Sequence, residues 1–76
     1  MITIYGKPRC SFCKNAISLC ERLNLEYEYK LLDADYTAEE LFKLVPEART
    51  FPQVFIDGKP IGGFVELKNI LQQGAG

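Results

Sequence analysis

The sequence predicts an α/β fold in which a small mixed four-stranded sheet carries three packed helices. Short β-branched and aromatic runs alternate along the chain with segments whose apolar residues recur every three or four positions. Toward the C-terminal end, two strand-like runs flank an Asp-Gly pair, which is a strong hairpin signal. These observations predict the order β-α-β-α-β-β-α in a single domain that covers residues 1–76.

The first unit of the predicted fold is a strand, a helix and a second strand. Residues 2–5 (ITIY) form a short apolar run that Gly6 ends, so we expect a buried strand there. A helix follows from Ser11 to about Leu23, and residues 25–31 (LEYEYKL) then alternate as a half-buried strand. The residues spaced for the apolar face of this helix are Phe12, Cys13, Ala16, Ile17, Leu19, Cys20 and Leu23. A unit this compact is typical of a parallel crossover.

Two further helices are expected in the second half of the chain. Thr37 and Glu40 have the spacing of a capping box, which predicts a helix start, and Pro46 ends that helix. Residues 64–73 (FVELKNILQQ) predict the last helix, with Gly74 at its end. The expected apolar face of this last helix consists of Phe64, Leu67, Ile70 and Leu71.

A β-hairpin is predicted between these two helices. Residues 53–57 (QVFID) read as a strand, and residues 59–63 (KPIGG) return beside it after the Asp57-Gly58 turn. Pro60 lacks an N–H group, so it suits an edge strand. A parallel crossover followed by a helix, an antiparallel hairpin and a last helix is the minimal thioredoxin-like arrangement.

The composition limits the classes of protein to which the chain can belong. A hydrophobic content of 47% in 76 residues predicts one small folded domain. The net charge of −1 argues against a general nucleic-acid or membrane-surface binder. No signal peptide precedes the first strand, and no apolar run approaches the ~20 residues that span a bilayer. We therefore expect a cytoplasmic protein with neither nucleic-acid nor membrane partners.

The cysteine and histidine counts narrow the chemistry. Three cysteines, two of them in one Cys-x-x-Cys, are a poor match to the disulfide framework of a secreted protein. Histidine is absent, which excludes Cys-His dyads, and a closed four-cysteine zinc site lacks one ligand. We therefore predict no metal site within the chain. Cys20 falls on the apolar helix face and is expected in the core.

The Cys10-Ser11-Phe12-Cys13 stretch lies where the first strand ends and the first helix begins. Free N–H groups and the positive end of the helix dipole favour a thiolate at Cys10. We expect Cys10 to be the exposed thiolate that attacks a disulfide. Cys13, one turn inside, is expected to stay protonated and to resolve the mixed disulfide. The alternative is a pair of structural cysteines in the core.

Two motifs in the second half predict a binding surface. Thr50-Phe51-Pro52 directly precedes a strand, and a cis bond before Pro52 would turn the backbone of Phe51 outward to pair with an extended peptide. The alternative is an ordinary proline at the start of a strand. Gly62-Gly63 precedes the last helix, where backbone N–H groups can bind a carboxylate without hindrance from a side chain.

With these three motifs in this order, the chain resembles the glutaredoxin family along nearly its whole length. The segments that carry the resemblance are residues 5–13 (YGKPRCSFC), 50–57 (TFPQVFID) and 61–64 (IGGF). The resemblance implies a monomeric enzyme that reduces protein disulfides and glutathione-mixed disulfides, with glutathione as the reductant. It also implies disulfide-containing protein partners such as ribonucleotide reductase.

The resemblance assigns a role to each residue of the site. Cys10 would be the nucleophile and Cys13 the resolving thiol. The residues that would bind glutathione are Lys7, Phe12, Thr50, Phe51, Pro52, Gly63, Phe64 and Val65. Lys7 would face its glycine carboxylate, and Phe12 would flank the groove. Residues 50–52 would pair with its cysteinyl backbone, and N–H groups of residues 63–65 would hold its γ-glutamyl carboxylate.

Two departures from the family pattern leave alternatives open. Ser11 stands where the family usually has proline, and some dithiol members with serine there bind a [2Fe–2S] cluster between two subunits. Such a cluster would use two Cys10 thiolates and two glutathione sulfurs. Val65 replaces a polar or acidic residue, although Glu66 keeps the acid that commonly follows. The other alternative is a small redoxin recharged by thioredoxin reductase.

Overall fold

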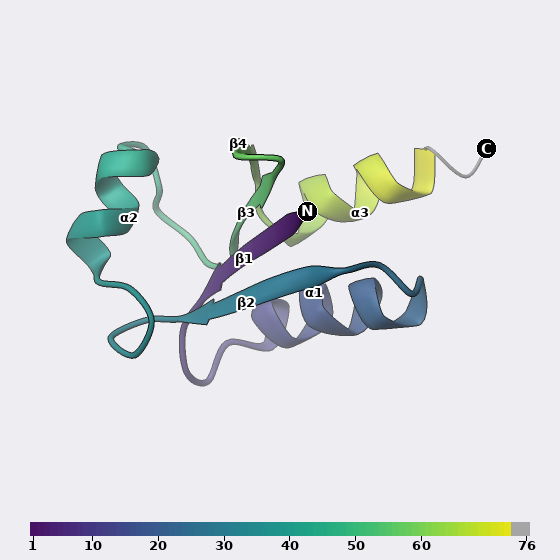
Figure 1. The fold of residues 1–76 in the computed structure, drawn as a ribbon, viewed down its shortest axis with the longest axis horizontal. Coiled ribbons are helices and arrows are strands. Elements are labelled where there is room, and N and C mark those ends of the chain that lie inside the picture. The colour runs from purple at the N-terminus through teal and green to yellow at the C-terminus, as the bar shows by residue number, and fades with distance from the viewer. Residues whose placement is uncertain (74–76) are drawn as a thin grey trace.

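The computed structural model describes residues 1–73 and contains the predicted order of elements (Figure 1). Within this range the strands are β1 (Ile2–Gly6), β2 (Tyr27–Leu31), β3 (Gln53–Ile56) and β4 (Lys59–Gly62). The helices are α1 (Ser11–Arg22), α2 (Ala38–Leu44) and α3 (Phe64–Gln73). The predicted fold class is therefore confirmed. The expected helix end at Gly74 lies outside the described residues.

The four strands form one mixed sheet in the order β2-β1-β3-β4. Central strand β1 pairs in parallel with β2, which confirms the crossover, and antiparallel with β3. β4 returns antiparallel beside β3 and forms an edge of the sheet, as the position of Pro60 predicted. Val54 pairs with Gly62 and Phe55 with Pro60, so Ile61 is the extra residue of a β-bulge. The sequence analysis did not predict this bulge.

The helices cover both faces of the sheet. α1 and α3 pack on one face over the larger core, which contains Cys20 as predicted (Figure 1). The buried members of this core are Ile2, Ile4, Ala16, Leu19, Cys20, Val54 and Leu67. Tyr5 and Phe55 point to the other face, where they meet Tyr36 and Leu41 of α2 and its preceding loop. Because strand side chains alternate between faces, one sheet supplies both cores.

The local start and stop signals act as the sequence predicted. Thr37 caps α2 and exchanges hydrogen bonds with Glu40 in a complete capping box, and α2 ends at Leu44 ahead of Pro46. Asp57 and Gly58 both have positive φ (51° and 82°), which is the type I′ geometry that suits a two-residue hairpin. These signals therefore fix where the hairpin turns and where α2 begins and ends.

Four side chains or boundaries differ from expectation. Strand β2 begins at Tyr27 because the Leu25 N–H bonds to the Cys20 carbonyl (2.9 Å) in the turn after α1. Leu23 is 45% exposed because it follows the last residue of α1. Ile70 is 44% exposed, although the neighbouring Leu71 packs against the larger core. Phe12 is also exposed, in the first turn of α1, where it lines the candidate site.

No helix within residues 1–73 combines the length and the apolar character needed to cross a membrane.

Candidate active site

Cys10 is the N-cap residue of α1. Its backbone is extended (φ −112°, ψ 107°), and its sulfur accepts a hydrogen bond from the Cys13 N–H at 3.2 Å. An acceptor at this position takes up one of the unpaired N–H groups of the helix start, so a negative charge on the sulfur is stabilised there. Cys10 is only 8% exposed, which corrects the expectation of an exposed thiol. Packing around the helix start therefore leaves little of Cys10 open to solvent.

Arg9 sets up this position through an unusual backbone conformation. Its φ is +59°, in the left-handed region that side chains other than glycine seldom occupy. Such conformations are concentrated at functional sites, because the surrounding structure has to impose them. The sequence carried no signal for this feature, since arginine is not a typical residue for positive φ.

Cys13 lies one turn inside the helix and is 1% exposed. Burial, followed by its hydrogen bond with Cys10, raises the pKa of the Cys13 thiol from 9.0 to about 11. At neutral pH the group is therefore a thiol, as the sequence analysis expected. Cys10, Cys13 and Cys20 are all free cysteines in the structure.

A groove with a volume of about 230 Å³ lies at the start of α1 and α3. Its walls are formed by Phe12, Thr50, Phe51, Pro52, Gly63, Phe64, Val65 and Glu66. All the predicted glutathione-binding residues except Lys7 are thus brought together in one groove. The rings of Phe12 and Phe64 lie 6.1 Å apart and join the two helix starts across it. The Phe51–Pro52 peptide bond is cis.

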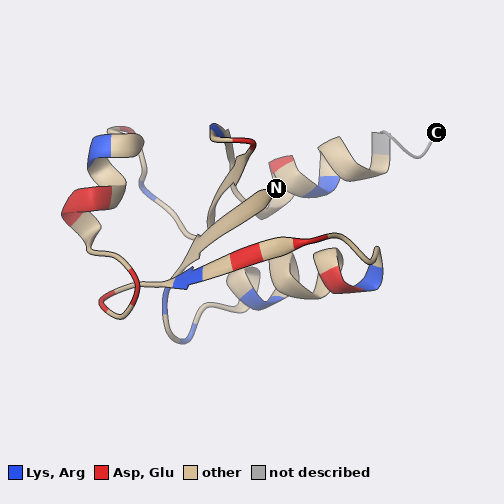
Figure 2. Ribbon diagram, viewed as in Figure 1, with Lys and Arg blue, Asp and Glu red and all other residues tan. Residues whose placement is uncertain are grey.

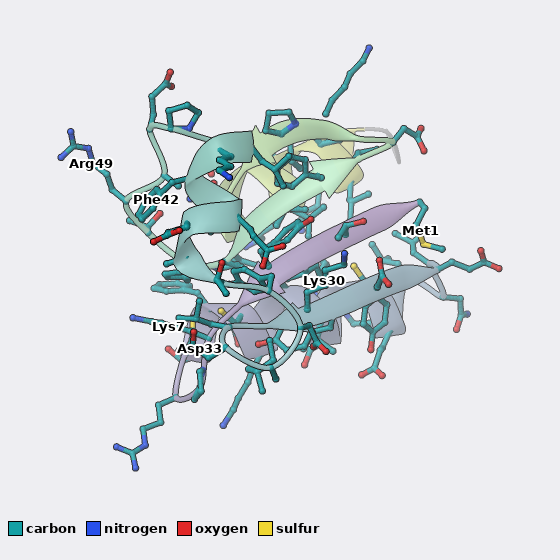
Figure 3. The ribbon with its side chains drawn as sticks, turned by 60° about the vertical axis from the view of Figure 1, so that its left-hand side comes forward. Met1, Lys7, Lys30, Asp33, Phe42 and Arg49 are labelled. Atoms are coloured by element: carbon teal, nitrogen blue, oxygen red, sulfur yellow. The ribbon has the colours of Figure 1, made fainter. Side chains whose placement is uncertain are left out.

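Lys7 lies at the Phe51 end of the groove. Its Nζ atom is 5.4 Å from the centroid of the Phe51 ring, within the range of a cation–π contact. Figure 2 shows positive charge in the loop between β1 and α1, and Figure 3 shows Lys7 and Arg49 on the side of the molecule away from Met1. This end of the groove therefore offers a positive charge to a ligand.

Glu66 is a member of the groove that the predicted set did not include. Its Oε1 accepts a hydrogen bond from the Gly63 N–H at 2.7 Å. Gly63 precedes α3, so this is half of a capping box in which the third helical residue reaches back. The predicted use of the Gly63 N–H for a ligand carboxylate is therefore not available in this conformation. The spacing from Gly63 to Glu66 was the signal that could have revealed it.

The two glycines before α3 are required by close contacts. Gly62 has a φ of +114°, and a Cβ atom there would lie 2.7 Å from Cγ of Glu66. A Cβ atom on Gly63 would lie 3.2 Å from the Pro52 carbonyl oxygen. A side chain at Gly62 would displace the Glu66 side chain, and one at Gly63 would press on the Pro52 backbone. The absence of a side chain on both glycines therefore favours the close approach of α3 to Pro52.

Within residues 1–73, no three or more His, Cys, Asp or Glu side chains come together as a metal site. The reactive groups that the structure places at the start of α1 are two thiols. A thiol at the first turn of a helix and a second, protonated thiol behind it are the two groups that thiol–disulfide exchange needs. Fold and site together define a thiol–disulfide oxidoreductase of the thioredoxin-like class.

Comparison with known proteins identifies the family within this class. The sequence model of the glutaredoxin family matches residues 2–61. A glutaredoxin from Haemophilus influenzae is 35% identical over an alignment of 79 positions, which covers 95% of this chain and 91% of the relative. Glutaredoxin 1 from Francisella tularensis, solved as a complex with cacodylate, superposes with a TM-score of 0.80 at 26% identity, over 97% of this chain and 94% of the other. This chain belongs to the glutaredoxin family of thiol–disulfide oxidoreductases.

A buckwheat glutaredoxin–glutathione complex has the same fold, with a TM-score of 0.81 at 27% identity. The superposition covers 96% of this chain and 69% of the buckwheat chain.

Proposed function

We propose that this protein uses glutathione to reduce protein disulfides and glutathione-mixed disulfides through Cys10 and Cys13. The observation that carries the proposal is the groove between Phe12, Pro52 and Phe64, which adjoins the start of α1. The buckwheat glutaredoxin of the same fold was solved as a complex with glutathione, which supports glutathione as the ligand.

The proposed reaction begins at Cys10. The Cys10 thiolate attacks one sulfur of the substrate disulfide, the S–S bond breaks, and the other sulfur departs as a thiolate that takes up a proton. For a glutathione-mixed disulfide, this step frees the substrate thiol and leaves glutathione on Cys10. A second glutathione thiolate then attacks that bond, which yields oxidised glutathione and regenerates Cys10. For a protein disulfide, Cys13 loses its proton and its sulfur attacks the Cys10 sulfur of the mixed disulfide. The bond from Cys10 to the substrate breaks, the Cys10–Cys13 disulfide forms, and the second substrate sulfur leaves and takes up a proton. Two glutathione molecules then reduce the Cys10–Cys13 disulfide and leave as oxidised glutathione.

In this proposal, positively charged or N–H groups at the two ends of the groove face the two carboxylates of glutathione. Lys7 faces the glycine carboxylate at the Phe51 end, and the first N–H groups of α3, on Phe64 and Val65, face the γ-glutamyl carboxylate. Thr50 and Phe51 pair with the cysteinyl backbone. Glu66 moves away from the Gly63 N–H if that group also takes part.

The test is reduction of a glutathionylated peptide, with glutathione and glutathione reductase supplying the electrons. We expect turnover that Cys10→Ser abolishes. Cys13→Ser should retain this activity and lose reduction of protein disulfides, because only the latter needs the resolving thiol. Cys20→Ser is the matched control, since Cys20 lies in the core. Turnover in the absence of Cys10 would overturn the mechanism.

The proposal extends to the cellular role. A monomer in the reducing cytoplasm, with ribonucleotide reductase among its protein substrates, fits a dithiol that must be reduced again after each cycle.

Coupling to thioredoxin reductase at the rate seen with glutathione would favour the alternative of a small redoxin. A cluster shared between Cys10 of two chains stays a prediction that rests on Ser11, and iron analysis of anaerobically purified protein tests it.

A further inference from the structure

A second groove lies between α2 and the loop that leads to Pro52. Its volume is about 120 Å³, and we call it the α2 groove. Its walls are formed by Leu41, Phe42, Ala48, Arg49, Thr50 and Phe51. Thr50 and Phe51 also line the groove at the start of α1 and α3, which we call the active-site groove, so the two grooves meet at these residues. A chain that leaves the active-site groove along residues 50–51 therefore reaches the α2 groove.

The α2 groove has an apolar surface that the fold leaves uncovered. Phe42 is 49% exposed, although Leu41 beside it is buried in the smaller core. Phe51 is half-buried and packs against that same core, so the wall opposite α2 is anchored. Covering an exposed aromatic ring removes apolar surface from water and stabilises a complex. The α2 groove is therefore suited to bind an apolar side chain.

Two positive charges flank the α2 groove. Arg49 forms part of its wall, and the Nζ atom of Lys7 lies 5.4 Å from the centroid of the Phe51 ring. Figure 3 shows Lys7, Phe42 and Arg49 on the same side of the molecule. Within residues 1–73 neither of the two cations forms an ion pair with a carboxylate. A partner that carries an acidic residue beside an apolar one is therefore complementary to this surface.

We propose that the α2 groove binds an apolar side chain of the disulfide-containing protein substrate, next to an acidic residue and close in sequence to the cysteine that Cys10 attacks. The inference rests on the proposed reduction of protein disulfides. There the backbone of Thr50 and Phe51 pairs with the residues around the substrate cysteine, so the chain on one side of that cysteine continues into the α2 groove. Glutathione ends in glycine and has no apolar side chain to place there. The α2 groove thus selects among protein substrates.

The experiment uses short peptides whose single cysteine is joined to thionitrobenzoate by a disulfide. The Cys10 thiolate attacks the peptide sulfur, the S–S bond breaks, and thionitrobenzoate leaves as a coloured thiolate. All proteins carry Cys13→Ser, so each reaction stops at the disulfide between Cys10 and the peptide.

The peptides differ only around the cysteine. In a background of serine and glycine, one leucine is moved through the three positions on each side, because three extended residues span about 10 Å. The best of these peptides is then made with aspartate or with lysine beside the leucine.

We expect one leucine position to raise the second-order rate constant by about tenfold over serine, the range for one side chain in an apolar groove. Aspartate beside that leucine should add about two- to fivefold at low salt, and lysine should not. Phe42→Ala should remove the preference for leucine, and Arg49→Gln should remove the preference for aspartate. The reaction with the peptide that lacks both residues should stay within about twofold in each variant.

Leu44→Ala and Lys43→Gln are the matched controls. Both positions lie on α2 next to Phe42 or close to it, Leu44 is 52% exposed, and neither lines the α2 groove. Both controls should keep the two preferences. Equal rates for all peptides overturn the proposal, and so does a leucine preference that survives Phe42→Ala or that Leu44→Ala also removes. No reaction with any peptide would overturn the proposed reduction of protein disulfides, and this inference with it.

A second copy of this chain is the other occupant that the experiment has to separate. Sedimentation velocity of the reduced protein should give a monomer at the concentration of the peptide assay. A dimer that Phe42→Ala dissociates would show that another copy covers the α2 groove, and it would overturn the proposal.

Discussion

Alkaline pH should destabilise the reduced protein through Cys13. Burial, followed by the hydrogen bond with Cys10, raises the pKa of this thiol from 9.0 to about 11 in the folded chain. The folded state thus holds the proton more tightly than the unfolded state does. The stability that Cys13 contributes is complete below pH 9 and is lost as the pH rises toward 11.

The magnitude follows from the two pKa values. At pH 10 an unfolded thiol with a pKa of 9.0 is about 90% ionised, while a folded thiol with a pKa of about 11 is about 10% ionised. Ionisation of Cys13 then raises the equilibrium constant of unfolding by about tenfold, which lowers the free energy of unfolding by about 1.4 kcal/mol. At pH 8 the same calculation gives less than about 0.1 kcal/mol.

The assay is guanidinium denaturation at pH 8 and pH 10 in the presence of a phosphine reductant. Wild type should lose about 1.4 kcal/mol more than Cys13→Ala between these two conditions. Cys20, Tyr27, Tyr29 and Tyr36 also have raised pKa values, through burial first, and because all four are present in the two proteins these effects of burial cancel in the comparison. Equal losses in wild type and variant would refute the reasoning.

Substitutions at three further positions test other parts of the structure by denaturation at neutral pH. Tyr36→Phe removes the buried hydrogen bond to the Gly6 carbonyl and should cost about 1 kcal/mol of stability. Glu66→Ala should cost about 0.5–1 kcal/mol because Gly63 loses its capping partner, and Glu66→Gln, which keeps an acceptor, should cost less. Arg9→Gly should be neutral or stabilising by up to about 1 kcal/mol, because it removes the Cβ atom that is unfavourable at a positive φ. Arg9→Val should be destabilising, because a β-branched side chain fits this conformation less well than arginine does, although both variants remove the charge. Equal effects of the paired variants would contradict the assigned causes.

Much of the fold could be predicted because its signals are local. The capping box at Thr37, the Asp57-Gly58 turn and Pro60 each act within a few residues, and each was found where expected. Periodicity predicted the three helices, but it could not distinguish the apolar residues that are buried from those that stay exposed. Ile70 follows the helical spacing and is nonetheless exposed, whereas the neighbouring Leu71 packs against the core.

The site was predicted less completely, because it depends on contacts between distant segments. The cysteine pair and its place at a helix start follow from the sequence pattern, whereas the members of the groove came from the family resemblance. The spacing from Gly63 to Glu66 permits a hydrogen bond between Glu66 and the Gly63 N–H, but the rotamer of Glu66 decides whether that bond forms. The positive φ of Arg9 and the placement of Tyr29 beside Gly6 likewise arise only when the chain is packed.

The strand order has a consequence for how copies of this protein behave toward one another. An open sheet leaves two outer strands whose unpaired backbone groups can recruit another chain and start a fibril. On β4, Pro60 interrupts the row of N–H donors, and on β2 the exposed carboxylate of Glu28 adds a charge. Both features disfavour the pairing of an outer strand with a strand of another copy. We therefore expect this protein to resist self-association at high concentration.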